Sequence, residues 1–171
     1  MSKYQDILKG GDLRSIGDAN KIVQLVKNQN EFDELFIGLT DADRKVVMRT
    51  ADAIEKITID NSDYLQKHKN QLLQFCKTAT YIELKWHLAL LISRVSLTEK
   101  ELGHIWQILT NWAKDKHESK IVRVNSIQGL FNLLKQQPEL IQDFNLTLVT
   151  VEKEKIPSIN ARIKKIKNAS R

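Results

Sequence analysis

The sequence predicts an all-α protein built from stacked pairs of helices, and three observations predict it. Strand signals are scarce, because no Asn-Gly or Asp-Gly turn occurs and alternating β-branched stretches are short, as in 146–151. Helix-capping residues stand ahead of several runs with helical apolar spacing. The apolar pattern also recurs along the chain at a spacing of 38 residues. We expect about nine helices and no significant β-structure.

The helix starts are marked by residues that can bind the free N–H groups of a first turn. Asp43 and the residues 61–63 stand ahead of two periodic runs. Thr98 and Glu101 form a T-x-x-E capping box, and Pro157 stands where a first helical turn tolerates proline. The helices expected from these signals cover residues 46–57, 64–76, 102–112 and 158–167.

The apolar residues of segment 46–57 reappear in 84–95 and again in 122–133. In each copy they are spaced i, i+4, i+7, i+8 and i+11, which places them on one face of an α-helix. The helices that precede these copies also correspond, at an offset of 37 residues. The aligned columns are Val46/Leu84/Val122, Thr50/Leu88/Ser126, Ala53/Leu91/Gly129, Ile54/Ile92/Leu130 and Ile57/Val95/Leu133. One helix pair cannot bury such a face alone, so each pair must stack on the next, as in an α-solenoid.

Two of the copies resemble the HEAT-repeat pattern, in which a short acidic turn precedes a second helix with valine, arginine and small residues. The resemblance is carried by Leu39, Asp41, Asp43, Val46, Val47, Arg49, Ala51, Ala53 and Ile54, and by Ser119, Ile121, Val122, Arg123, Ser126, Gly129 and Leu130. The middle copy departs from it, with Lys85, Trp86 and His87 in place of the Val-Arg core. The resemblance covers residues 17–135 and implies a right-handed α-α superhelix of about four helix pairs. It specifies architecture better than activity, since HEAT arrays serve as scaffolds, transport adaptors and, in one DNA-repair group, enzymes.

The chain length of 171 residues suits a single domain over 1–171. Within it we expect an N-terminal cap segment over 1–17, stacked helix pairs over 18–152, and a basic C-terminal capping helix and tail over 153–171. The apolar residues of this last helix are expected to turn inward: Ile159, Ile163 and Ile166.

The net charge of +6 is concentrated near the C-terminus. Seven of the 27 Lys and Arg residues but two of the 21 Asp and Glu residues lie in 151–171, so this segment has a net charge of +5. The longest nearly uncharged apolar run, 86–93, is far shorter than the roughly 20 residues of a membrane span. The first residues lack an apolar signal core, and the single cysteine cannot form an internal disulfide. These features predict a cytoplasmic protein without membrane partners.

The resemblance implies that the second helix of each pair lines the concave surface of the stack. The polar stripe beside the core columns is therefore the candidate binding surface, and it suits a protein or peptide partner because a rigid stack lowers the ordering cost of binding. The alternative is a solvated helix face whose charges pair locally, as Asp52 and Lys56 can. The residues expected to contact a partner are Arg49, Lys56, Trp86, His87, Arg94, Asn125 and Asn132.

We expect no catalytic residues, no metal site and no cofactor. None of the four histidines has the spacing typical of zinc ligands on one helix face, and phosphate-loop and serine-hydrolase motifs are absent from the sequence. Cys76 aligns with Ala113 in an apolar column and is expected to be a small buried residue. Trp112 lies on a core stripe, whereas Trp86 lies beside the polar stripe and, if exposed, suits a partner anchor.

The runner-up interpretation is nucleic-acid binding through a basic C-terminal cluster. The cluster consists of Arg162, Lys164, Lys165 and Lys167. The resemblance also brings in the HEAT-like alkylpurine DNA glycosylases, which place a tryptophan, an aspartate and an arginine in the concave groove. The nearest constellation here is Trp112, Asp115 and Arg123, although Asp115 lies in an apparent turn and Trp112 on a core stripe. The sequence leaves the partner and the oligomeric state open.

Overall fold

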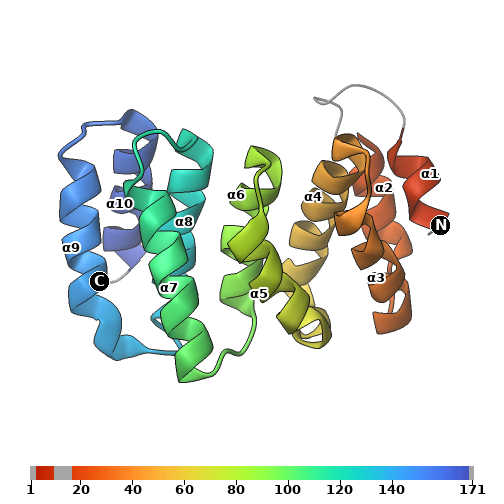
Figure 1. Ribbon diagram of the computed structural model, residues 1–171, viewed down its shortest axis with the longest axis horizontal. Helices are drawn as coiled ribbons and strands as arrows, with labels where there is room; N and C mark the ends of the chain where they lie inside the picture. The colour runs from red at the N-terminus through yellow and green to blue at the C-terminus, as the bar shows by residue number, and fades with distance from the viewer. Residues whose placement is uncertain (1–2, 10–16, 170–171) are drawn as a thin grey trace. The chain divides into compact units, whose positions relative to one another are not determined.

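The computed structural model describes residues 3–9 and 17–169, and every regular element in this part of the chain is helical (Figure 1). The all-α prediction is confirmed, with ten α-helices and four short 3₁₀-helices in the described residues. The chain divides into two compact units, Met1–His68 (unit 1) and Lys69–Arg171 (unit 2). That the whole chain forms one domain stays a prediction. Of the predicted cap segment 1–17, residues 1–2 and 10–16 lie outside the described part.

Unit 1 is built around its longest helix, α4, which packs against α1, α2 and α3. Phe32 and Leu35 of α3 and Ile54 of α4 are among the residues that form its buried core. The elements of unit 1 are α1 (Lys3–Leu8), α2 (Gly17–Leu25), α3 (Gln29–Phe36), η1 (Ile37–Thr40), α4 (Arg44–Asp60) and η2 (Ser62–His68).

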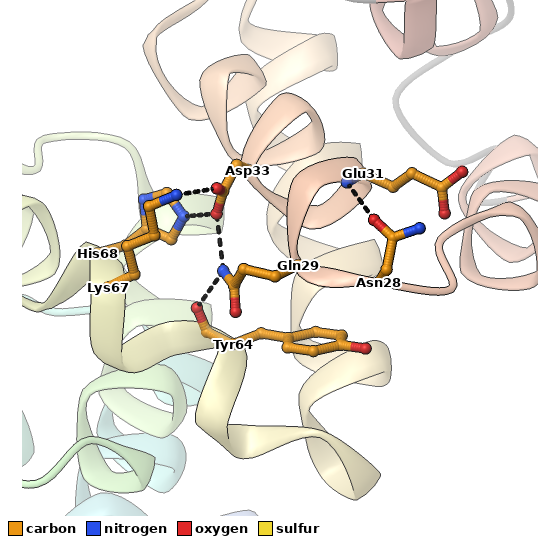
Figure 2. Close-up of polar contacts among 7 residues, drawn as sticks. All are labelled: Asn28, Gln29, Glu31, Asp33, Tyr64, Lys67 and His68. Atoms are coloured by element: carbon orange, nitrogen blue, oxygen red, sulfur yellow. Dashed lines mark hydrogen bonds and ion pairs between the residues drawn. The ribbon is translucent and has the colours of Figure 1, made fainter.

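The helix starts in unit 1 follow the capping rules. The side chain of Asp43 accepts a hydrogen bond from the backbone N–H of Lys45 at the start of α4, at 2.8 Å. Asn28 caps α3 by accepting from the N–H of Glu31 at 3.0 Å (Figure 2). The helix predicted over 46–57 is therefore confirmed as the central part of α4.

Unit 2 consists of three helix pairs whose members form two rows. The first-layer helices α5, α7 and α9 contact one another in sequence, as do the second-layer helices α6, α8 and α10 (Figure 1). Neighbouring pairs thus cover each other's apolar faces, as the repeat requires. The elements of unit 2 are α5 (Lys69–Thr78), α6 (Ile82–Leu91), η3 (Ile92–Arg94), α7 (Glu99–Lys114), α8 (Lys120–Leu133), η4 (Pro138–Leu140), α9 (Ile141–Glu152) and α10 (Pro157–Ala169).

The local signals from residue 61 onward behave as expected, with one exception. The capping box is formed, because Thr98 and Glu101 each bind the other's backbone N–H. The helix predicted over 64–76 is instead a 3₁₀ segment, η2, followed by α5, and the change falls where Asp33 binds the last two residues of η2. The alternating stretch 146–151 is helical as part of α9, as the expectation of no significant β-structure implies; Leu148 and Val151 are buried, whereas Leu146 and Val149 are exposed.

The last helix, α10, packs on α8 and α9. Its three isoleucines, Ile159, Ile163 and Ile166, are buried, which confirms that they turn inward. None of the helices in residues 3–9 and 17–169 is both long and apolar enough to span a bilayer.

Candidate functional site: the second-layer face of unit 2

Three amide side chains of α8 form a row that we call the amide ladder: Asn125, Gln128 and Asn132. The Nδ2 of Asn125 donates to the backbone carbonyl of Trp86 at 3.0 Å, and the Nδ2 of Asn132 donates to Ser93 Oγ at 3.1 Å. The ladder therefore ties α8 to α6 and to η3.

The amide ladder also reaches α10, the next second-layer helix. Gln128 donates through Nε2 to Asn132 Oδ1 at 2.9 Å and accepts from the guanidinium of Arg162 at 2.8 Å. The side chains of all four partners are half-buried and held by more than one helix. Such fixed groups lose little conformational entropy when they bind a ligand.

A shallow apolar hollow lies at the start of α8, one turn before Asn125. Lys120, Ile121, Val124 and Ser158 line it, and its volume is about 320 Å³. Ile121, at the edge of this hollow, is 44% exposed. Tyr81 and Ile82, at the start of the neighbouring helix α6, are exposed as well.

Arg49 and Lys56, the two predicted contact residues of unit 1, both form hydrogen bonds within that unit. Arg49 is fully buried, and its Nη1 donates to the carbonyl of Leu8, at the end of α1. This position is in the interior, away from a surface open to a partner. Lys56 binds Asp52 at 2.7 Å, as its helical spacing suggests, and also Asn20 at 2.8 Å.

The predicted contact residues of unit 2 differ in exposure. His87 is buried, whereas Trp86 and Arg94 are half-buried. The ring of Trp86 lies 5.4 Å from that of His87, centroid to centroid. Trp86 is thus neither a core residue nor a fully open anchor.

The other two tryptophans, Trp106 and Trp112, differ from each other in burial. Trp112, expected in the core, is half-buried, and the ammonium of Lys85 lies 5.6 Å from its ring centroid. Trp106 is the more buried one, and its Nε1 donates to Asp143 at 2.7 Å. A buried indole needs such a partner for its N–H.

Two of the four residues of the basic C-terminal cluster bind other side chains of unit 2. Arg162 binds the amide ladder, and Lys167 pairs with Glu152 at 3.0 Å. Lys164 and Lys165 are exposed on α10. Half of the predicted cluster is therefore used within unit 2.

Trp112, Asp115 and Arg123, the residues that resemble the DNA-glycosylase constellation, make other contacts in the structure. Arg123 is buried, and its Nη1 and Nη2 bind the two carboxylate oxygens of Glu154 at 3.0 and 2.8 Å. Its Nε donates to the carbonyl of Ala113 at 2.9 Å. Asp115 is exposed beyond the end of α7, where it accepts from the N–H of His117. The geometry therefore assigns Arg123 to the interior of the repeat.

Unit 1 contains a polar cluster centred on Asp33 of α3 (Figure 2). This cluster was not predicted from the sequence. Its carboxylate binds Lys67, His68 at 2.7 Å and Gln29 at 2.7 Å. Gln29 also donates to the carbonyl of Tyr64 at 3.1 Å. The imidazole of His68 stacks on Phe36 with the ring centroids 3.9 Å apart. The cluster therefore fastens η2 to α3.

The cluster makes Asp33 an unusually strong acid. Partial burial by itself raises the pKa of Asp33, but the hydrogen bonds from Lys67, Gln29 and His68 outweigh this and lower the pKa from 3.8 to about 2. Because the folded state prefers the ionised carboxylate, Asp33 stabilises unit 1 above pH 3.8, and this contribution disappears as the pH falls towards 2.

Replacing Asp33 with asparagine is expected to destabilise unit 1 by about 1 kcal/mol at pH 7, since the pairs are partly exposed to solvent. The difference from the wild type should shrink between pH 4 and pH 2. Urea unfolding followed by circular dichroism at several pH values measures it. Asp63→Asn is the control, because Asp63 is exposed in the same segment and should have little effect. A difference that stays constant over this pH range would contradict the assignment.

Cys76 is buried, as predicted, and so is Ala113. Burial raises the pKa of the Cys76 thiol to about 12. The thiol therefore stays protonated at neutral pH, which makes it a poor nucleophile.

The family model for the HEAT repeat domain matches residues 12–170. Neither curated proteins nor solved structures gave a match. HEAT repeats form helical scaffolds that are typically non-catalytic and commonly bind proteins. The paired helices of unit 2 and the match over nearly the whole length lead to one conclusion. The chain belongs to the HEAT repeat domain family.

Proposed function

We propose that the protein is a non-catalytic scaffold that binds a peptide segment of a partner protein on the second-layer face of unit 2. The observation that carries the proposal is the position of Asn125, which directly follows Val124 of the apolar hollow on α8. Its Nδ2 is held by the Trp86 carbonyl, and no group in the described part of the chain donates to its Oδ1. This oxygen is available to accept from a peptide N–H.

The hollow supplies the second half of the interaction. Ile121 and Val124 offer an apolar contact for one side chain of the peptide. Tyr81 and Ile82, at the start of α6, are further exposed apolar residues of unit 2. A peptide is thus recognised by a fixed amide and an adjacent apolar contact, a combination typical of peptide-binding grooves.

The test is a selection of random peptides on the immobilised full-length protein, followed by fluorescence anisotropy with the selected peptides. Ile121→Glu is expected to weaken binding about tenfold or more, because it places a charge in the hollow. Asn125→Ala should weaken it by a smaller factor. Leu146→Glu, at an exposed leucine of α9, is the matched control and should leave binding unchanged. Peptides that bind the wild type and Ile121→Glu equally well would contradict the proposal.

The same assay separates peptide binding from nucleic-acid binding. Labelled single-stranded and duplex DNA and RNA are titrated at low and physiological salt, with Lys164→Glu/Lys165→Glu as the variant. Phosphate contacts weaken steeply as ionic strength rises, whereas an apolar peptide contact is much less sensitive. Binding that survives physiological salt and is lost in this variant would favour the nucleic-acid interpretation instead.

A further inference from the structure

The apolar hollow at the start of α8 is bordered by two loops of unit 2. The α7–α8 loop ends at Ser119, next to Lys120 of the hollow, and the α9–α10 loop ends two residues before Ser158 of the hollow. Arg123, one turn into α8, binds Glu154 of the second loop, so the two loops lie close together. A ligand bound at the hollow therefore lies next to both of them.

Exposed lysines occupy these two loops and the helix ends beside them. We call them the basic rim: Lys114, Lys116, Lys120, Lys153 and Lys155. None of the five forms an ion pair within residues 3–9 and 17–169. The carboxylates of the same segments, apart from Asp115, pair with cations of other helices: Glu118 with Lys85, Glu152 with Lys167 and Glu154 with Arg123. The positive charge of the basic rim is thus available to a ligand.

The opposite ends of α7 and α8 carry balanced charges. The exposed charged residues there are Glu99 and Lys100 at the start of α7, and Lys135 and Glu139 after the end of α8. The excess of exposed lysines is therefore confined to the helix ends that border the hollow. Its position is a property of this surface and does not simply follow from a basic composition.

The start of α8 adds a second preference for negative charge. Ser119 stands at its N-cap position but makes no side-chain hydrogen bond to the first turn, whereas Thr98 caps α7 in this way. The N–H groups of a first helical turn carry partial positive charge and favour an anion nearby. This preference acts at the same place as the basic rim.

We propose that the peptide bound at the hollow is acidic, with carboxylates beside the apolar side chain that contacts Ile121 and Val124. This inference rests on the peptide-binding function proposed above and names the chemistry of the partner. Lysine carries its charge on a flexible stem, so the basic rim can pair with carboxylates at several positions of a peptide. The apolar lining of the hollow favours a peptide over a nucleic acid, because a sugar–phosphate backbone has no aliphatic side chain to place there.

The selection of random peptides on the full-length protein tests the inference. Aspartate and glutamate should be enriched beside an apolar residue in the selected peptides. Replacing every carboxylate of a selected peptide by its amide should weaken binding about tenfold or more, as measured by fluorescence anisotropy. The affinity should also fall as salt is added, but less steeply than for a nucleic acid, because a short peptide carries no condensed layer of counterions.

Two double variants with the same change in net charge locate the contact. Lys120→Glu/Lys155→Glu reverses one charge in each loop and should weaken binding of the acidic peptides about tenfold or more. Lys100→Glu/Lys135→Glu reverses two charges at the opposite ends of α7 and α8 and should change the affinity by less than about twofold. All four lysines are exposed, so the circular dichroism spectra of both variants should match that of the wild type.

The possible results separate this inference from the function on which it rests. Neutral or basic selected peptides that lose affinity in Ile121→Glu would overturn the acidic partner and leave peptide binding standing. Acidic peptides that lose affinity equally in the two double variants would overturn the basic rim as their contact. A library that yields no binding peptide would overturn both proposals. DNA or RNA that binds at physiological salt, and is lost only in Lys120→Glu/Lys155→Glu, would assign the basic rim to a phosphate backbone instead.

Discussion

Replacing Arg123 with methionine is expected to lower the free energy of unfolding of unit 2 by about 3 kcal/mol. Methionine keeps the apolar stem but removes all three nitrogen donors. The carbonyl of Ala113 then loses its side-chain donor, and the carboxylate of Glu154 loses the cation that binds both of its oxygens. Leaving such groups without their partners costs more than an average exposed ion pair contributes, because Arg123 is 2% exposed.

Urea unfolding followed by tryptophan fluorescence measures this change, since all three tryptophans lie in unit 2. Lys100→Met, at an exposed position of α7, is the control and should change stability by less than about 0.5 kcal/mol. The double variant Arg123→Met/Glu154→Met should be more stable than Arg123→Met alone, because no carboxylate is left without a cation. A variant of Arg123 as stable as Lys100→Met would show that the buried pair contributes little.

The pH dependence of the Arg123→Met effect gives a second readout of the same pair. The hydrogen bond from Arg123 lowers the pKa of Glu154 below its ordinary value of 4.5. The ionised carboxylate is therefore favoured in the folded state, and the pair stabilises unit 2 above pH 4.5. The stability difference between the wild type and the variant should shrink as the pH falls below this value.

The repeat architecture could be predicted from local spacing alone. The columns that contain Val46, Leu84 and Val122 mark the buried sides of α4, α6 and α8, and all three residues are buried. A helix turns by a fixed angle per residue, so apolar spacing determines which side of it is buried without knowledge of its neighbours.

The buried arginines could not be assigned in this way. The helical spacing places Arg49 on the polar stripe, and its long side chain instead reaches the carbonyl at the end of α1. Arg123 does the same at the end of α7. Both interactions satisfy carbonyls of a last helical turn and depend on a partner that the helix's own pattern does not contain.

Several polar contacts join residues about one repeat apart, a spacing that the analysis of local motifs did not use. Asp33 and His68 are 35 residues apart, Trp106 and Asp143 are 37 apart, and Ser93 and Asn132 are 39 apart. These separations are close to the repeat of 37 to 38 residues, because equivalent helices of neighbouring pairs lie side by side. A search for complementary polar residues about one repeat apart would have found these pairs. Which of them meet still depends on side-chain directions.

Replacing Gly129 with alanine is expected to destabilise unit 2 by about 3 kcal/mol, although alanine is the better helix former by about 1 kcal/mol. A Cβ at Gly129 would lie 2.3 Å from the carbonyl oxygen of Ala89 and 3.0 Å from Cδ1 of Leu109. The first of these atoms belongs to the backbone of α6, so α6 and α8 must move apart. Glycine at this position is therefore what allows the two helices to approach so closely.

Gly103→Ala is the matched control, because it makes the same chemical change inside another helix of unit 2. A Cβ at Gly103 would meet no atom within 4 Å, and the position is exposed in the middle of α7. This variant should therefore gain about 0.5–1 kcal/mol from helix propensity alone. Urea unfolding by tryptophan fluorescence compares the two, and the expected result is a change of opposite sign. If both variants were more stable than the wild type, helix propensity and not the close contact between α6 and α8 would determine the effect of replacing Gly129.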